Sequence, residues 1–184
     1  LLGTLTEGDA QTASLTVVLN KQPLSNVVVD LTISPTDEIT TSVGSLTFTA
    51  ANWNTPQVIT VSSVNEFLID GTIVSTITFS IKPSSDAAFT SLPNQFVLAA
   101  NLDNDVAGFT VSSLGGGALQ EGSSATVSFT LVLDAEPDSG LVILDIASLD
   151  LTEVGVDILT TPRVFSPANW NIPQTVTLSS VDDI

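Results

Sequence analysis

The sequence predicts an all-β protein made of two consecutive antiparallel β-sandwiches, the second incomplete at its C-terminal end. Three observations lead to this prediction. Long segments alternate between apolar and polar residues. Thr, Val and Ile are frequent within these segments, whereas Gly, Pro, Asn and Asp separate them. A seven-residue motif occurs twice. No segment shows sustained helical periodicity, so we expect strands joined by turns throughout.

The repeated motif reads Ala-Asn-Trp-Asn-Thr-Pro-Gln at residues 51–57 and Ala-Asn-Trp-Asn-Ile-Pro-Gln at residues 168–174. Its two Trp residues lie 117 positions apart, whereas Glu7 and Glu121, each followed by Gly, lie 114 positions apart. The second copy therefore carries three extra residues between these landmarks. A repetition of this length indicates a tandem array.

We expect the first repeat at residues 1–105 and the second at residues 106–184. In the first, the segment 13–19 places Ala13, Leu15, Val17 and Leu19 on one face and polar residues mostly on the other. This alternation is typical of a strand with one face on a core and one in water. Further strands are predicted, in chain order, over residues 27–33, 46–49, 58–62, 72–81 and 96–102.

The second repeat shows the same alternation at residues 127–133. About seven strands in ~110 residues, with regular turns, predict a sandwich of immunoglobulin-like type. Counterparts of the last two strands of the first repeat are missing before residue 184. We therefore expect either that the protein continues or that a strand of another chain fills the gap. The remaining strands of this repeat are predicted over residues 108–112, 141–147, 163–166 and 174–179.

The charge balance excludes several partners. Three Lys and Arg residues stand against twenty Asp and Glu residues, a formal net charge of −17. Such a chain repels nucleic acid and anionic lipid headgroups. No apolar run approaches the ~18 residues that span a bilayer, so no direct membrane insertion is expected. A hydrophobic content of 43% nevertheless supports packed cores.

Catalysis is not expected. The chain has no His, Tyr or Cys, so the commonest general bases and nucleophiles are absent. No Ser stands in a Gly-x-Ser-x-Gly motif. The Gly115-Gly116-Gly117 run lacks the Lys-Ser/Thr of a phosphate-binding loop, and we interpret it as a turn. We predict that the protein is not an enzyme.

Most carboxylates lie between the predicted strands, at positions such as Asp37-Glu38 and Asp103-Asn104-Asp105. Loops at one end of a sandwich converge, so carboxylates distant in sequence can meet there. A cluster of four or five carboxylates does not stay ionised without a compensating cation, and Lys and Arg are scarce. All-oxygen coordination of flexible geometry suits Ca²⁺ best.

Three segments carry a resemblance: Thr6-Glu7-Gly8, the segment Asn65-Glu66 with Asp70 after a predicted strand, and the run from Leu102 through Asp103-Asn104-Asp105 to Phe109. Together they resemble a Calx-β domain, a family that binds Ca²⁺ at one tip of a β-sandwich. The Asn-Trp-Asn-x-Pro-Gln motif is similar to repeats of very large bacterial surface and adhesin-like proteins.

The resemblance implies Ca²⁺ ligands in both repeats. Asn65 and Phe67 stand where the family usually has acids, which implies fewer ions or weaker binding in the first repeat. In that repeat the implied ligands are Glu7, Glu66, Asp70, Asp103 and Asp105, with Asp37 or Glu38 as a further candidate. In the second repeat they are Glu121, Asp182 and Asp183.

The leading hypothesis is a calcium-stabilised extracellular repeat module, a stiff spacer or stalk in a large cell-surface or secreted adhesin-like protein. Its partners would be neighbouring repeats, and ions bound near Asp103 and Asp105 would also restrain the linker. One alternative is a subunit of a polymerising extracellular filament, sheath or surface layer, completed by strand exchange with other copies. Another is a carbohydrate-binding module, which requires exposed side chains at Trp53 and Trp170. We expect these Trp residues to anchor turns instead.

Overall fold

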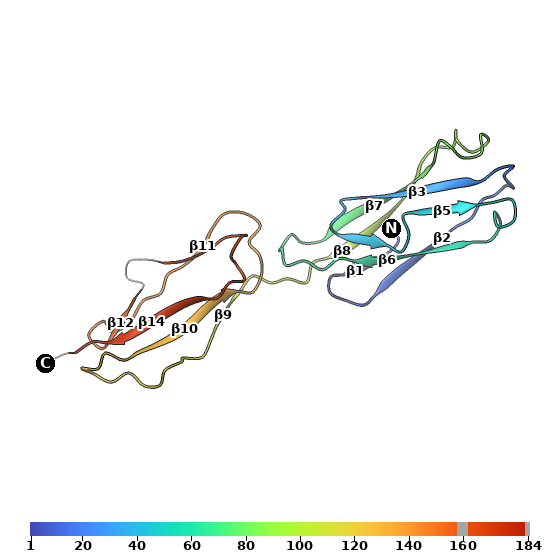
Figure 1. The fold of residues 1–184 in the computed structure, drawn as a ribbon. Helices are drawn as coiled ribbons and strands as arrows, with labels where there is room; N and C mark the ends of the chain where they lie inside the picture. Colours follow the sequence, from blue (N-terminus) through green and yellow to red (C-terminus); the bar gives the residue numbers. More distant parts are fainter. Residues whose placement is uncertain (158–161, 183–184) are drawn as a thin grey trace. The chain divides into compact units, whose positions relative to one another are not determined.

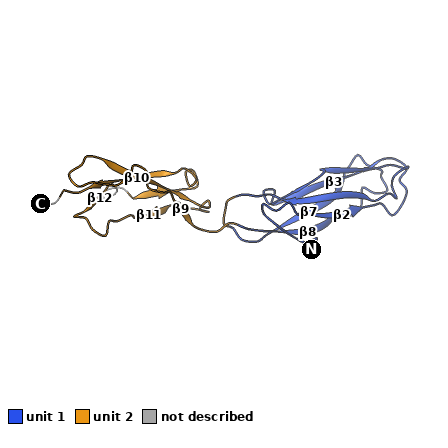
Figure 2. Ribbon diagram, turned by 90° about the horizontal axis from the view of Figure 1, so that it is seen from below, with its two compact units in different colours: residues 1–66, 70–104 blue, residues 67–69, 105–184 orange. Residues whose placement is uncertain are grey.

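The computed structural model describes residues 1–157 and 162–182, and this part of the chain contains fourteen β-strands and no helix. It confirms the predicted all-β fold. The chain divides into two compact units (Figure 2): unit 1 comprises Leu1–Glu66 and Asp70–Asn104, and unit 2 comprises Phe67–Ile69 and Asp105–Ile184. Among the described residues, no helix is long and apolar enough to cross a membrane.

Unit 1 consists of two β-sheets (Figure 1). All neighbouring strands pair in antiparallel fashion except β1 and β8, which are parallel. The five-stranded sheet has the order β1 (Thr4–Thr6), β8 (Gln95–Leu102), β7 (Ile73–Ile81), β3 (Val27–Ser34) and β5 (Ser45–Phe48). The three-stranded sheet has the order β2 (Thr12–Val17), β6 (Gln57–Ser63) and β4 (Ile39–Thr41).

The core of unit 1 lies between these two sheets. Alternating residues of β3, such as Val27 and Val29, are buried, as are Ile59 and Val61 of β6. Burying an aliphatic or aromatic side chain of this size contributes about 1.5–3 kcal/mol to folding. The period of two seen in the sequence thus produces one apolar face on each sheet, and the two faces pack together.

Unit 2 repeats much of this strand pairing. Its larger sheet has β10 (Thr126–Leu133) beside β14 (Gln174–Ser180) and β14 beside β12 (Val154–Val156), as β2 lies beside β6 and β6 beside β4 in unit 1. Its smaller sheet pairs β11 with β13, the counterparts of β3 and β5. The larger sheet has the order β12 (Val154–Val156), β14 (Gln174–Ser180), β10 (Thr126–Leu133) and β9 (Phe109–Val111). The smaller sheet contains β11 (Val142–Leu144) and β13 (Arg163–Phe165).

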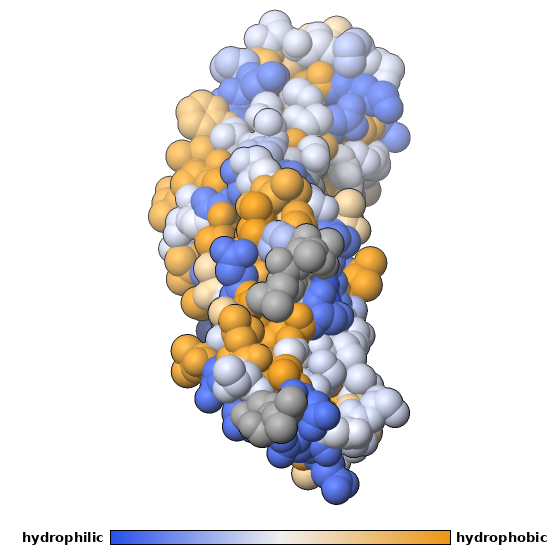
Figure 3. Space-filling model, turned by 90° about the vertical axis from the view of Figure 1, so that its left-hand side faces the viewer, coloured by the Kyte–Doolittle hydropathy of each residue, from blue (hydrophilic) through white to orange (hydrophobic). Residues whose placement is uncertain are grey.

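Within the described residues, unit 2 has no counterparts of β7 and β8. Its buried core is correspondingly small and centres on Leu131, Phe165 and Val176. Large apolar side chains stay exposed, among them Phe109 and Ile143. Apolar surface is prominent in the view of Figure 3.

Three short strands were not predicted: β1, β4 and β12. Each has only three residues, too few to show alternation. They form because a longer neighbour offers backbone groups: β8 pairs with β1, β6 with β4, and β14 with β12.

The repeated motif forms the same turn in both units. In unit 1, Asn52 Oδ1 accepts hydrogen bonds from the backbone N–H of Thr49 at 2.6 Å and from its hydroxyl at 3.0 Å. In unit 2, Asn169 Oδ1 accepts the equivalent bonds from Ser166 at 2.6 and 2.9 Å. The first Asn of the motif therefore closes the turn after β5 and after β13.

The two Trp residues are joined to the sandwich by their backbones. The N–H of Leu19 donates to the carbonyl of Trp53, and the N–H of Leu133 donates to that of Trp170, both at 3.1 Å. Both Trp side chains are half-buried. These backbone bonds support the predicted role of both Trp residues as turn anchors.

Candidate metal centre

Carboxylates gather at one end of unit 1, where the segment after β1, the connection between β6 and β7, and the end of β8 meet. Glu7 directly follows β1, Glu66 follows β6, and Asp70 precedes β7. The backbone N–H of Glu7 donates to the carbonyl of Leu102 at 3.0 Å, which fixes Glu7 beside the end of β8. The hydroxyl of Ser63 donates to the carbonyl of Thr6 at 3.0 Å and joins the ends of β6 and β1.

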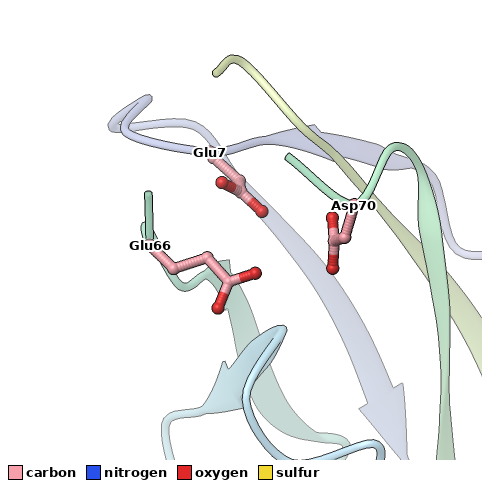
Figure 4. A group of neighbouring side chains, drawn as sticks. All are labelled: Glu7, Glu66 and Asp70. Atoms are coloured by element: carbon pink, nitrogen blue, oxygen red, sulfur yellow. The ribbon is translucent and has the colours of Figure 1, made fainter. Parts of the chain in front are cut away.

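The three carboxylates point into one space (Figure 4). One oxygen each of Glu7, Glu66 and Asp70 lies within 4.8 Å of the others. A carboxylate oxygen of Asp103 also lies within 4.8 Å of one from Glu7. The structure thus brings together Glu7, Glu66, Asp70 and Asp103, four of the carboxylates that the resemblance implies as ligands of the first repeat.

Glu7 is the buried member of the group, with only 1% of its surface exposed. Its Oε2 atom is buried and makes no hydrogen bond, and the same holds for Oδ1 of Asp70. A buried carboxylate oxygen without a partner is costly, because burial removes water and nothing replaces it. A cation at this position would supply the missing interaction.

Asn101 holds the other oxygen of Glu7. Its amide Nδ2 donates to Glu7 Oε1 at 2.9 Å and to Glu38 Oε2 at 3.1 Å. Asn101 and Glu38 are themselves buried, at 1% and 4% exposure. One amide group therefore orients two carboxylates from opposite sheets.

The sequence interpretation missed Asn101 and placed Glu38 only as a further candidate. A polar residue inside the predicted strand 96–102, two positions before Asp103, was the available indication. Strand alternation could assign Asn101 to a face, but it could not show which groups that face meets.

Burial and mutual repulsion shift the pKa values of two carboxyl groups upward. The pKa of Glu66 rises to about 7, because burial disfavours its charged form and Asp70 and Glu38 repel it. Burial also raises the pKa of Glu7, with Asp103 as the next cause, while the backbone N–H of Glu66 acts in the opposite direction. The charged groups that shift these two pKa values are all carboxylates.

Two backbone features allow the segments to approach one another. Gly8 has a φ of +68°, which favours Gly, and a Cβ there would lie 2.6 Å from Asn65 Oδ1 and would displace that side chain. Asn104 Nδ2 donates to the carbonyl of Glu7 at 2.6 Å. Asp103 Oδ2 accepts the N–H of Gly71 at 2.9 Å, which fixes the segment after Asp70.

The remaining implied ligands belong to unit 2. Asp105 is the first residue of the longer segment of unit 2. Glu121 and Asp182 are exposed, and Asp183 lies outside the described residues. A Cβ at Gly122, which follows Glu121, would lie 3.5 Å from Asp182 Oδ1, so this turn and Asp182 are close. In the described part of unit 2, however, no three carboxylates lie close enough to hold an ion.

The donor set in unit 1 fits a hard divalent cation. It consists of carboxylate oxygens from three loops, and the chain contains no His or Cys that would favour a softer metal. Ligands from separate loops can adjust their spacing, which suits a large ion with variable geometry. The arrangement can therefore bind a metal ion, and the chain offers no His or Cys as a general base or nucleophile.

Comparisons with known proteins give distant similarities only. No protein-family model matches the chain, and no curated protein matches it. The calcium binding domain CBD12 of CALX1.1 is similar at a TM-score of 0.39 and 13% identity, over 98% of this chain and 73% of that one. The E. coli chaperone DraB is similar at a TM-score of 0.37 and 10% identity, over 72% and 88%. The CsuC-CsuE chaperone-tip adhesion subunit complex of Acinetobacter baumannii is similar at 0.39 and 7%, over 99% and 85%.

Proposed function

We propose that unit 1 binds Ca²⁺ through Glu7, Glu66, Asp70 and Asp103, and that the chain is a calcium-stabilised repeat module. The unpartnered oxygen of buried Glu7 carries this proposal, because the Glu7 carboxylate also lies within 4.8 Å of those of Glu66 and Asp70. Such a group either holds protons or holds a cation. A divalent ion neutralises the repulsion without protonation and satisfies the buried oxygen.

Binding would join the segment after β1 to the connection between β6 and β7, which are distant in sequence. Glu7 belongs to the end of β1, Glu66 to the end of β6, and Asp70 to the segment before β7. An ion shared among them restrains both sheets at this end. Asn101 and Asn104 hold Glu7 in place for this role, through its side chain and its backbone carbonyl.

The expected stabilisation is modest. Extracellular modules typically bind Ca²⁺ with a Kd of about 10⁻⁴–10⁻³ M. At about 1 mM free Ca²⁺ and a Kd of about 10⁻⁴ M, mass action stabilises the folded unit by about 1.4 kcal/mol. Sites of this strength would be filled outside cells, where Ca²⁺ is near millimolar, and empty in the cytosol. We propose that the module belongs to an extracellular or cell-surface protein, where a site of this strength would be occupied.

The tandem arrangement supports a spacer or stalk role. Unit 2 repeats the strand pairing of unit 1, and both units close the same Asn-Trp-Asn turn. Repeated domains of one design are typical of chains that span distance rather than perform catalysis. The natural partners of such a module are neighbouring repeats of the same protein.

The test is thermal unfolding of the whole chain in about 1 mM Ca²⁺, in about 1 mM Mg²⁺ and in excess EDTA. We expect Ca²⁺ to raise the melting temperature of unit 1 more than Mg²⁺ does. Glu7→Gln, which keeps the shape and removes the charge, should abolish this rise. It should leave the metal-free protein as stable as before or more stable, because it removes a buried charge.

Asp9→Asn is the matched control, since it removes one exposed carboxylate two residues away. It should keep the full response to Ca²⁺. If Ca²⁺ raised the melting temperatures of the wild type and of Glu7→Gln equally, Glu7 would not be a ligand. The absence of any response to Ca²⁺ in the wild type would refute the proposed function.

A further inference from the structure

Unit 1 carries an apolar groove that the calcium site does not involve. The groove has a volume of about 440 Å³ and lies along the outer edge of β2. β2 is the edge strand of its sheet, so no strand among the described residues pairs with its outer side. The opposite sheet supplies Val29, Phe79 and Val97 to the groove, and the β2 side supplies Leu15, Val17 and Leu19.

Unit 2 shows what can occupy such an edge. Its strand β10 is the counterpart of β2, and there the outer edge pairs with β9. In this antiparallel pair Leu131 lies opposite Val111, and Leu133 opposite Phe109. Counted from the Glu-Gly landmarks, Leu131 and Leu133 correspond to Val17 and Leu19 of unit 1.

The burial of these residues differs between the units. Leu131 and Leu133 are buried, with 3% and 7% of their surface exposed. Val17 and Leu19, which have no strand on their outer side among the described residues, are only half-buried. Residues directly opposite in an antiparallel pair point to the same face. Phe109 and Val111 therefore lie on the same face of their sheet as Leu131 and Leu133. They stay 53% and 51% exposed, because the described part of unit 2 has no counterparts of β7 and β8 in the opposite sheet. Unit 1 has both of these strands, so equivalent side chains there would point into the groove.

We propose that the groove of unit 1 is a docking site for an extended peptide segment of the β9 type, in which a Phe is followed two residues later by Val. The segment pairs antiparallel with Val17 and Leu19 and inserts its Phe and Val side chains between the sheets. Backbone hydrogen bonds supply affinity, and the two apolar side chains supply specificity. This proposal does not depend on calcium binding.

The residues around Phe109 refine the sequence that the groove accepts. A Cβ at Gly108 would collide with the carboxylate of Asp134, so a Gly precedes the Phe. The hydroxyl of Thr110 donates to Asp134 Oδ1 at 2.7 Å. Asn20 is the counterpart of Asp134 in unit 1, and its amide oxygen can accept the same bond. The preferred segment is thus Gly-Phe-Thr-Val.

The direct test fuses a copy of residues 105–114 in front of Leu1 of the whole chain. This length reproduces in unit 1 the spacing that separates β9 from the Glu-Gly turn in unit 2. Hydrogen exchange should slow by about tenfold or more at the N–H groups of Val18 and Asn20. These are the counterparts of Val132 and Asp134, and the Asp134 N–H donates to Gly108 at 3.0 Å. The added segment should also raise the melting temperature of unit 1.

Two matched variants separate specific docking from the effect of a longer chain. The first carries Phe109→Ser and Val111→Ser in the added copy only, and should show neither slowed exchange nor a higher melting temperature. The second carries Val18→Pro, which removes one edge N–H. Edge strands tolerate Pro, so the melting temperature of the unextended protein should not change. The rise in melting temperature that the extension produces should be lost.

Equal protection by the extension and by its Ser variant would overturn the proposal. Sedimentation of the chain with and without the extension measures its oligomeric state. A dimer that persists when the extension is added would assign the groove to another copy of the chain, and this result would also overturn the proposal. A monomer whose Val18 and Asn20 amides become protected only with the Phe-Val extension would establish the docking site.

Discussion

At the residue scale, Glu66 links the stability of unit 1 to pH. Its folded pKa of about 7 lies above the ordinary value of 4.5, because burial and the carboxylates of Asp70 and Glu38 disfavour its charge. A raised folded pKa means that the folded state binds the proton more tightly than the unfolded state does. The resulting stabilisation is complete below the ordinary pKa and is lost as the pH rises through about 7.

We therefore expect the metal-free protein to lose stability in unit 1 between about pH 5 and about pH 8. Ca²⁺ binds the ionised carboxylates, so its stabilising effect should grow over the same range. Denaturant unfolding at a series of pH values, in EDTA and in Ca²⁺, measures both trends. Glu66→Gln should flatten the metal-free profile. A metal-free stability that rises with pH in this window would contradict the assignment.

Gly8 is the residue whose replacement should disturb the site without touching a ligand. Its φ of +68° is strained for a residue with a side chain, and a Cβ would displace the side chains of Asn65 and Asn104. Gly8→Ala should lower the free energy of unfolding of unit 1 by about 1–3 kcal/mol and should weaken Ca²⁺ binding, because Glu7 is its neighbour. Gly3→Ala is the control, since nothing lies within 4 Å of a Cβ at Gly3. Similar losses for the two variants in urea unfolding would show that the close approach is unimportant.

At the scale of elements, strand length decided what could be predicted. The long strands, such as β3 and β7, carry enough alternating residues to be found from their pattern. The three-residue strands β1, β4 and β12 do not, and they form only because a longer strand lies beside them. β1 nevertheless matters most for the site, because it delivers Glu7.

The Asn-Trp-Asn turn is an element whose two Asn residues differ in role. Asn52 accepts two hydrogen bonds from Thr49, whereas Asn54 is exposed. Asn52→Ala should lower the free energy of unfolding of unit 1 by about 1–3 kcal/mol, since each lost bond costs about 0.5–1.5 kcal/mol. Asn54→Ala should change it by less than about 0.5 kcal/mol. Denaturant unfolding of the two variants side by side checks this difference, and equal effects would show that Asn52 does not close the turn.

At the scale of the whole molecule, the two units have separate cores. The core of unit 1 gathers residues from both of its sheets, whereas that of unit 2 is smaller and centres on Phe165 and Val176. We expect calorimetry to show two unfolding transitions, of which Ca²⁺ raises the one belonging to unit 1. The reason is that three carboxylates converge there and not in the described part of unit 2. Phe165→Ala should lower only the melting temperature of the transition that belongs to unit 2. A single shared transition would contradict this assignment.

Much of the candidate site was accessible from the sequence, although by different routes. The resemblance to a Calx-β domain implied Glu7, Glu66, Asp70 and Asp103, and the structure places these four together. It did not indicate that Asn101 joins Glu7 to Glu38. The reason is that a hydrogen bond between residues 94 positions apart depends on the stacking of both sheets, which no local pattern encodes.

The sequence by itself determined the all-β class, the longer strands and the tandem arrangement, because alternation, turn residues and repetition are local properties of the chain. Only the tertiary structure decided the environment of each carboxylate. Glu7 and Glu121 stand in the same Glu-Gly context, yet Glu7 is buried and Glu121 is exposed. The difference arises because β8 lies against Glu7 in unit 1, and the described part of unit 2 contains no corresponding strand. Burial depends on which strands pack over a residue, and that packing turns an acidic loop residue into a candidate metal ligand.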